Sequence, residues 1–258
     1  MRPWFTTEQL APDTWVISEY RHWEETHCYL LIGADRALLI DTGLGICNIY
    51  DEVCKLTDKP VTAVATHIHW DHIGGHGEFD RLAVHELERN WLDGHFPLPP
   101  QAVRQNLTAR PCPFPDGFDP AGYQVFQGPP QLVFQDGHRF DLGGRVVEAV
   151  HTPGHSPGHC CFYEPERRRL YAGDLIYKGC LDMFYPPRTL CSFWPRSERS
   201  AAWVCGRCCP ATISWTSPPP LSHRWRRGCA GWSDPVSSGR GPAFSTSAPS
   251  SSTCDPRP

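Results

Sequence analysis

The sequence predicts an α/β (α+β) domain over residues 1–187, followed by a segment of different character from 188 to 258. Three observations lead to this prediction: short apolar runs separated by turn residues, one stretch with helical spacing, and a change of composition near residue 187. Apolar runs bounded by Gly, Pro and Asp are typical of strands. With 258 residues, 40% of them hydrophobic, the chain is long enough for one large domain with a substantial core.

The first elements are expected before residue 57. Strands are predicted over residues 14–20, 28–33 and 37–40, and the turn residues at 34–36 favour a hairpin or meander between the last two. Residues 46–56 carry apolar side chains at helical spacing, which predicts a helix.

The later elements alternate with polar and Gly-rich turns. Asp136-Gly137 is typical of a two-residue hairpin turn, so the strands on either side of it are expected to pair with each other. Strands are predicted over residues 61–65, 81–85, 131–135, 139–142, 145–150, 159–163 and 169–172, with a short helix over 86–92.

A dense group of metal-binding side chains follows the apolar run at 61–65. His67, His69, Asp71 and His72 fall within six residues, in a loop at a strand end, where functional residues are often carried. His67 and His69 are two residues apart and can converge on one cation, whereas Asp71 and His72 come after a further turn and can face a second. Imidazole and carboxylate suit zinc, iron and manganese. A solvated His-rich loop is the alternative, which so dense a spacing disfavours.

This motif, His-x-His-x-Asp-His followed by Gly74-Gly75, resembles the signature of the metallo-β-lactamase superfamily. Three further matches occur in the family's order: Asp41-Thr42-Gly43, residues 152–156 (Thr-Pro-Gly-His-Ser) and Ala172-Gly173-Asp174. The resemblance covers residues 8–187. It implies a four-layer αββα sandwich, incomplete after about residue 187.

The resemblance also implies a metal centre with two zinc ions, with iron or manganese as alternatives. The implied ligands are His67, His69 and His155 for the first metal, and Asp71, His72 and Asp174 for the second.

Other roles follow from the same resemblance. Asp174 would bridge the two metals, and Asp41 would lie beneath them and orient the ligand imidazoles. Asp71 would also act in catalysis, by orienting the nucleophile or moving protons. Tyr177 and Lys178 follow the last motif and are candidate substrate contacts, although a solvent-exposed side chain is the alternative for Lys178.

The implied activity is hydrolysis by a metal-activated hydroxide. Residues 41–45, 65–67 and 173–179 most resemble the acyl-coenzyme A thioesterases of the superfamily, and the glyoxalase II-like hydrolases of glutathione thioesters come next. A lactonase or β-lactamase-like hydrolase is one alternative. A catalytically impaired fragment that lacks the last metal ligand is another.

Charge and composition limit the classes of molecule that the chain is expected to bind. The net charge of −4 gives no indication of nucleic acid or a membrane surface, and no apolar run approaches a membrane span or a signal-peptide core. The 13 cysteines follow no metal-binding or disulfide pattern, so free thiols and a cytoplasmic location are expected. The expected partner is a small-molecule substrate; the sequence gives no indication of oligomeric state.

The proline-rich stretch at residues 96–120 interrupts the pattern. Its seven prolines predict neither regular helix nor central strand. It is interpreted either as a rigid insertion over the active-site groove, contributing Phe96, Phe114 and Phe118 to an apolar wall, or as a surface loop without a chemical role.

Residues 188–258 differ sharply from the rest. They hold nine arginines against three acidic residues and no lysine, so residues 1–187 carry a balance of −10. The family has one more ligand histidine after the bridging Asp, in a sequence such as Leu-Pro-Gly-His. The only later histidine here, His223, has no such context.

A shift of reading frame accounts for both observations. Residues 208–213, Cys-Cys-Pro-Ala-Thr-Ile, can be encoded TGC-TGC-CCG-GCC-ACC-ATC. The frame one nucleotide upstream then reads Leu-Pro-Gly-His-His. We therefore expect a frameshift near residues 185–188, and a genuinely disordered segment is the alternative that the composition also permits.

Overall fold

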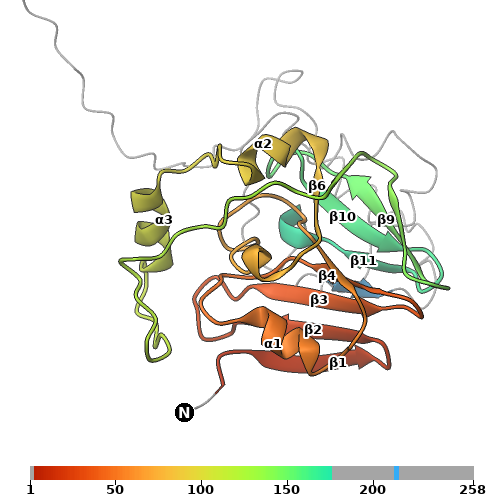
Figure 1. Ribbon diagram of the computed structural model, residues 1–258, viewed down its shortest axis with the longest axis horizontal. Helices are drawn as coiled ribbons and strands as arrows, with labels where there is room; N and C mark the ends of the chain where they lie inside the picture. Colours follow the sequence, from red (N-terminus) through yellow and green to blue (C-terminus); the bar gives the residue numbers. More distant parts are fainter. Residues whose placement is uncertain (1–2, 176–211, 215–258) are drawn as a thin grey trace, which may run out of the picture. The chain divides into compact units, whose positions relative to one another are not determined.

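The computed structural model describes residues 3–175 and 212–214, which form two β-sheets with short helices outside them (Figure 1). The first sheet has the strand order β1-β2-β3-β4-β5-β6-β7, and the second has the order β12-β11-β10-β9-β8. Within the described residues, no helix has the length and apolar character needed to cross a membrane.

The first sheet begins as a meander and continues with parallel strands. Its strands are β1 (Thr6–Ala11), β2 (Thr14–Ser18), β3 (His27–Ile32), β4 (Ala37–Ile40), β5 (Val61–Val64), β6 (Leu82–His85) and β7 (Leu132–Phe134). The first four pair antiparallel, and the pairs from β4 to β7 are parallel. Parallel neighbours need a crossover connection. Helix α1 (Ile49–Cys54) lies in the crossover from β4 to β5, and Asn48 caps it by accepting a hydrogen bond from the Asp51 amide.

The second sheet is antiparallel throughout. Its strands are β8 (Arg139–Asp141), β9 (Val146–His151), β10 (Cys160–Glu164), β11 (Arg169–Tyr171) and β12 (Thr212–Ser214). The strands predicted over residues 159–163 and 169–172 correspond to β10 and β11, which pair with each other. Strand β12 was not predicted, because its surroundings show no strand periodicity.

The predicted hairpin around Asp136-Gly137 is wrong. Strand β7, before the turn, pairs with β6 in the first sheet, whereas β8, after it, pairs with β9 in the second. The turn therefore carries the chain from one sheet to the other. Turn residues reverse the chain locally, but the partner of each strand depends on which core its side chains enter.

Successive side chains of the central strands enter two different cores, as the alternation of a strand requires. Leu31 and Leu38 face the second sheet, in a buried cluster with Phe140 and Phe162. Their neighbours Leu30 and Leu39 face the opposite way and join the cluster under α1. The predicted α/β sandwich is confirmed in this arrangement. The helical layer expected outside the second sheet falls on residues 176–211 and 215–258, outside the described part of the chain.

A buried arginine joins the two sheets. Arg145 donates to Glu164 of β10 at 2.8 Å and to the Thr14 hydroxyl of β2 at 2.8 Å, and it also reaches the carbonyl oxygen of Ile32. Because every donor meets an acceptor, the charge is buried with its hydrogen bonds intact.

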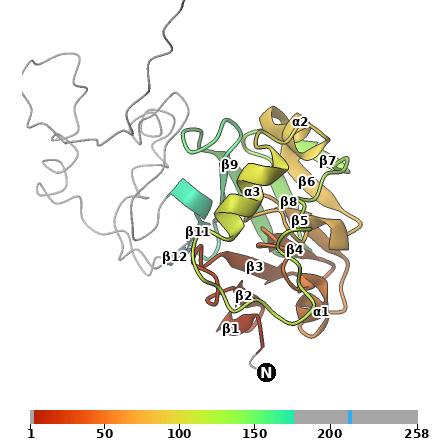
Figure 2. The same cartoon turned by 90° about the vertical axis from the view of Figure 1, so that its left-hand side faces the viewer.

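The proline-rich insertion contains a regular helix, which corrects the prediction that excluded one. Helix α3 (Pro100–Leu107) begins with proline at its first position, where the missing N–H costs no hydrogen bond. Figure 1 places α3 beyond one end of the strands, and Figure 2, which looks from that side, shows it in front of them.

The remaining helices are short. They are the 3-10 turns η1 (His76–Glu78), η2 (Glu86–Glu88) and η3 (Gly173–Leu175), and α2 (Arg89–Leu92). Six cysteines in the described ranges are free thiols, as expected: Cys28, Cys47, Cys54, Cys112, Cys160 and Cys161.

Candidate metal centre

The candidate ligands gather where strands of both sheets end. Asp41 directly follows β4, and the loop that holds His67 and His69 follows β5. His155 follows β9 and Asp174 follows β11 in the second sheet. The parallel pairing of β4 with β5 brings the first two segments to the same edge. The site therefore depends on the packing of one sheet against the other.

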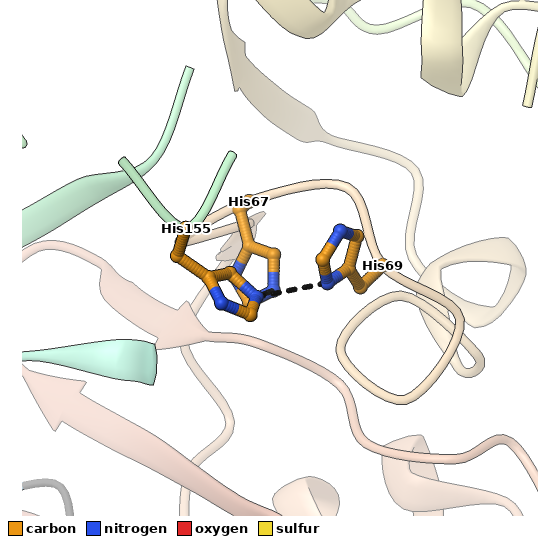
Figure 3. Close-up of side chains that lie close together, drawn as sticks. All are labelled: His67, His69 and His155. Atoms are coloured by element: carbon orange, nitrogen blue, oxygen red, sulfur yellow. Dashed lines mark hydrogen bonds between the residues drawn. The ribbon is translucent and has the colours of Figure 1, made fainter. Parts of the chain in front are cut away.

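Three histidines converge at this edge (Figure 3). The His155 Nε2 atom lies 3.1 Å from His67 Nε2 and 2.9 Å from His69 Nδ1. Burial and the neighbouring His72 lower the pKa of His67 well below its usual value. Burial, together with His155, lowers the pKa of His69 to about 4. Both rings are therefore neutral at neutral pH and offer lone pairs.

This arrangement fits a cation better than hydrogen bonds among the rings. A neutral imidazole carries one donor and one acceptor nitrogen, so a proton on His155 Nε2 can be given to only one of its two neighbours. Tetrahedral zinc with Zn–N distances of about 2.0–2.1 Å holds its ligand nitrogens about 3.3 Å apart. The two distances from His155 Nε2 to the other nitrogens are close to that spacing.

A second group adjoins the first. His72 Nε2 lies 3.3 Å from Asp71 Oδ2 and 3.3 Å from Asp174 Oδ1. The other oxygen of Asp174 lies 3.5 Å from His155 Nε2. One carboxylate thus presents one oxygen to each group. His67, His72 and Asp174 also offer ligand atoms within 4.8 Å of one another.

Opposite charges meet within this second group. Burial lowers the pKa of His72, but the carboxylates of Asp174, Asp71 and Asp41 outweigh burial and raise it well above its usual value. Burial raises the pKa of Asp174, but His72 outweighs it and holds the pKa below the usual range. The metal-free group is therefore an imidazolium among carboxylates, and a bound cation can replace that positive charge.

Asp41 holds both ends of the ligand loop that follows β5. Its oxygens accept from the Thr66 amide at 2.7 Å, the Thr66 hydroxyl at 2.9 Å and His72 Nδ1 at 2.9 Å. The bond to Nδ1 leaves the Nε2 atom of His72 turned toward the other ligands. The backbone of Asp41 has a φ of +60°, in the left-handed region that non-glycine residues rarely adopt. Such strain is typical of functional sites.

Glycines let the two loops around the ligands touch backbone to backbone. A Cβ atom on Gly45 would lie 2.4 Å from the Gly74 carbonyl oxygen, and Gly45 also has a φ of +68°. The Gly74 amide donates to the Gly43 carbonyl at 2.8 Å. The loops after β4 and β5 are therefore packed as a unit.

Several buried polar residues near the site were missed by sequence reasoning. Glu19 accepts from the Leu44 amide at 2.8 Å, and Glu88 accepts from the Ile68 amide at 2.6 Å. His159 is buried with its ring 5.2 Å from that of His67, and its Nδ1 atom contacts the Thr152 hydroxyl. A glutamate is usually exposed, and nothing in its spacing indicates which loop it will contact.

A cavity of about 670 Å³ opens over the ligands. Its lining includes Trp23, Glu24 and Glu25 from the loop between β2 and β3, and Pro97 and Leu98 from the insertion. The insertion therefore contributes to the cavity, but through residues other than those expected.

The expected phenylalanine wall is wrong. Phe96, Phe114 and Phe118 are partly buried and pack against the buried cluster under α1, and none of them lines the cavity. Tyr177 and Lys178 lie outside the described residues, so their predicted role stays a prediction.

Comparison with known proteins identifies the family. The sequence model of the metallo-beta-lactamase superfamily matches residues 22–222. The chain belongs to this superfamily. The match spans every candidate ligand from His67 to Asp174, and it extends past residue 187, where composition predicts a boundary.

Individual members of the superfamily are similar to the chain. Acyl-coenzyme A thioesterase MBLAC2 of Bos taurus is 31% identical over 212 residues, covering 76% of this chain and 75% of that protein. The atrochrysone carboxyl ACP thioesterase of Aspergillus chevalieri is 29% identical over 58% of this chain and 40% of its own length. A solved metallo-beta-lactamase from Pontibacter korlensis has a TM-score of 0.47 at 19% identity, covering 70% of this chain and 79% of that one. The present chain is therefore a hydrolase of the metallo-β-lactamase fold.

Proposed function

We propose that this chain is a metal-dependent hydrolase that cleaves a thioester of acyl-coenzyme A or glutathione at a centre for two zinc ions. The observation that carries the proposal is the position of Asp174, whose two oxygens face the two neighbouring groups of ligands. A carboxylate that bridges in this way is typical of two-metal hydrolases. Iron or manganese remain alternative occupants.

Each residue of the centre has a part in this chemistry. His67, His69 and His155 would hold the first ion, and Asp71, His72 and Asp174 the second. Zinc bound there supplies Lewis acidity, which acidifies water and polarises a carbonyl. Asp41 keeps His72 oriented.

Asp71 is suited to orient the nucleophile as a charged hydrogen-bond acceptor. Burial raises its pKa, but His72 outweighs burial and holds the pKa below the usual value, so the carboxyl is ionised at neutral pH. Its Oδ2 atom lies 3.3 Å from His72 Nε2, within the ligand group.

The cavity supports an acyl substrate. Trp23, Trp70 and Leu98 give it an apolar wall, and Glu24 and Glu25 are acidic. The part of the lining that the structure describes contains no lysine or arginine that would attract phosphates. This wall therefore suits the acyl chain of a thioester, not the phosphates of coenzyme A. The two thioesterases among the similar proteins support the same substrate class.

The reading frame of residues 188–258 belongs to the proposal, since it decides whether the second ion has its last ligand. Apart from Thr212–Ser214, this segment lies outside the described residues. Sequencing the gene across codons 180–215 tests the frame directly. A continuous frame with no open extension in the other frames would contradict the frameshift.

Zinc stoichiometry and hydrolysis of an acyl-coenzyme A test the function. We expect about two zinc ions per chain in a frame-corrected protein, and one or none in the chain as given. Parallel assays with a glutathione thioester, a lactone and a β-lactam decide the substrate class. A His69→Ala variant should lose zinc and activity, whereas His95→Ala, which removes an exposed histidine, should lose neither. If the protein cleaves the lactone or the β-lactam but neither thioester, the thioesterase assignment is wrong.

A further inference from the structure

Two glutamates of the turn after β6 have opposite environments. Glu86 is exposed and accepts from the Gln135 amide at the surface. Glu88, two residues later, is completely buried. A buried carboxylate is costly unless several donors satisfy it, so its partners reveal what it holds.

The partners of Glu88 come from two different loops. Its Oε2 atom accepts from the Ile68 amide at 2.6 Å. Its Oε1 atom accepts from the Gly158 amide at 2.7 Å and from the Ser156 hydroxyl. Each carboxylate oxygen therefore binds one loop only.

These two loops carry the three converging histidines. Ile68 lies between His67 and His69, in the loop after β5 of the first sheet. Ser156 and Gly158 follow His155, in the loop after β9 of the second sheet. One carboxyl group thus joins the two halves of the three-histidine group.

The residue at position 158 supports this arrangement independently. A Cβ atom on Gly158 would lie 2.9 Å from Glu88 Cγ and 3.1 Å from its carboxyl carbon. The backbone can approach the carboxylate closely only because this residue is glycine.

We propose that Glu88 is a positioning residue, whose single carboxylate sets the placement of His67 and His69 relative to His155. The inference rests on the proposed metal centre, since it assigns Glu88 a role in holding that centre's first three ligands. Glu88 contacts none of the ligand side chains in a hydrogen bond that the structure describes, and it acts through the backbone of their loops.

Glu88→Gln is the decisive variant. It keeps the shape of the side chain but replaces one acceptor oxygen with an NH₂ donor, which then faces an N–H or O–H donor of one loop. Ser156→Ala removes a single bond to Oε1 and leaves the Gly158 amide in place. Glu86→Gln makes the same chemical change on the same turn and serves as the matched control.

The first measurement is zinc affinity of the full chain, by competition with a chelator. We expect Glu88→Gln to lower the affinity about 10- to 100-fold, the usual effect of losing a residue that orients metal ligands. Ser156→Ala should have a smaller effect in the same direction, and Glu86→Gln none. The absorption spectrum of the cobalt-substituted protein should change in Glu88→Gln, because the three nitrogens are displaced.

The second measurement needs no metal. Hydrogen exchange in the metal-free protein should show lost protection at the Ile68 and Gly158 amides in Glu88→Gln, and at neither in Glu86→Gln. Wild-type zinc affinity together with protected amides in Glu88→Gln would overturn the inference. If neither the chain as given nor the frame-corrected protein binds metal, the proposed function fails, and the exchange measurement still decides whether Glu88 joins the loops. If Glu88→Gln does not fold, Ser156→Ala decides: unchanged zinc affinity and unchanged exchange at Gly158 would overturn the inference.

Discussion

Asp41 combines two features that are each unfavourable alone: a left-handed backbone and a buried carboxyl group. Burial raises the pKa of this carboxyl, although His72 and the Thr66 donors oppose the change. Its three hydrogen bonds reach Thr66, which precedes the ligand sequence, and His72, which ends it. The surrounding fold therefore compensates for these two costs, and Asp41 in turn holds the His72 imidazole in one orientation.

Replacing Asp41 with Asn should weaken zinc binding about 10- to 100-fold, mainly at the site that includes His72. An amide offers one acceptor oxygen where the carboxylate offers two, so either the contact with the Thr66 amide, made by Oδ1, or the contact with His72, made by Oδ2, is lost. A zinc titration followed by calorimetry measures the effect. Asp80→Asn, which alters an exposed carboxyl, should leave the titration unchanged.

At the scale of elements, the loops after β4 and β5 depend on glycine for their close contact. Gly45→Ala adds a methyl group 2.4 Å from the Gly74 carbonyl oxygen, at a backbone with positive φ. Gly94→Ala has the same kind of backbone with a φ of +87° but open space around it. Gly94→Ala should cost about 1–2 kcal/mol of unfolding free energy, and Gly45→Ala more than that. Urea denaturation of both variants checks this, and equal losses would contradict the loop contact.

The insertion gives the cavity part of its apolar wall. Leu98→Asp should reduce kcat/KM for long acyl chains more than for short ones, because each buried CH₂ group contributes about 0.8 kcal/mol. The ratio of kcat/KM for a long and a short acyl-coenzyme A measures this. Leu10→Asp, which changes an exposed leucine of β1 outside the cavity lining, should leave the ratio unchanged. If this ratio falls in both variants, or in neither, Leu98 does not bind the acyl chain.

Features that depend on local sequence could be predicted, whereas features that depend on distant segments could not. The spacing of His67, His69, Asp71 and His72 is local, and it indicated the ligand group directly. The contacts of Glu88 depend on two distant loops, so no local pattern reveals them. Helix α3 was missed because a proline count averages over the segment, whereas the effect of proline depends on its position in the helix.

At the scale of the whole molecule, the described fold buries many neutral histidines. Burial lowers the pKa of His67, His69, His76, His85 and His159, to about 3 for His76 and about 4 for His85. In the unfolded chain these rings titrate near pH 6.5. Below that pH the unfolded chain binds protons that the folded chain does not bind. The free energy of unfolding therefore decreases as the pH is lowered. His72, whose pKa is raised, is protonated in both states below pH 6.5, so its opposite contribution changes only above that pH.

The metal-free protein should therefore lose stability between pH 6.5 and about 4, by about 1.4 kcal/mol per pH unit for each proton taken up on unfolding. Urea denaturation at pH 7, 6 and 5 in the presence of a chelator measures the slope. His76→Gln should reduce the slope by one proton, whereas His95→Gln, at an exposed position, should not alter it. An unfolding free energy that stays constant from pH 7 to pH 5 would contradict the neutral burial of these rings.

The convergence of His67 and His155 has a consequence for the unfolded chain. The two residues are 88 positions apart, so a shared cation would close a large ring in the polypeptide. Cross-links that close rings of that size remove conformational entropy from the unfolded state, by about 4–5 kcal/mol in the chain-entropy estimate. Unlike a disulfide, this cross-link would form and break with the supply of the ion. The lifetime of the folded chain in a cell would then follow the local concentration of metal.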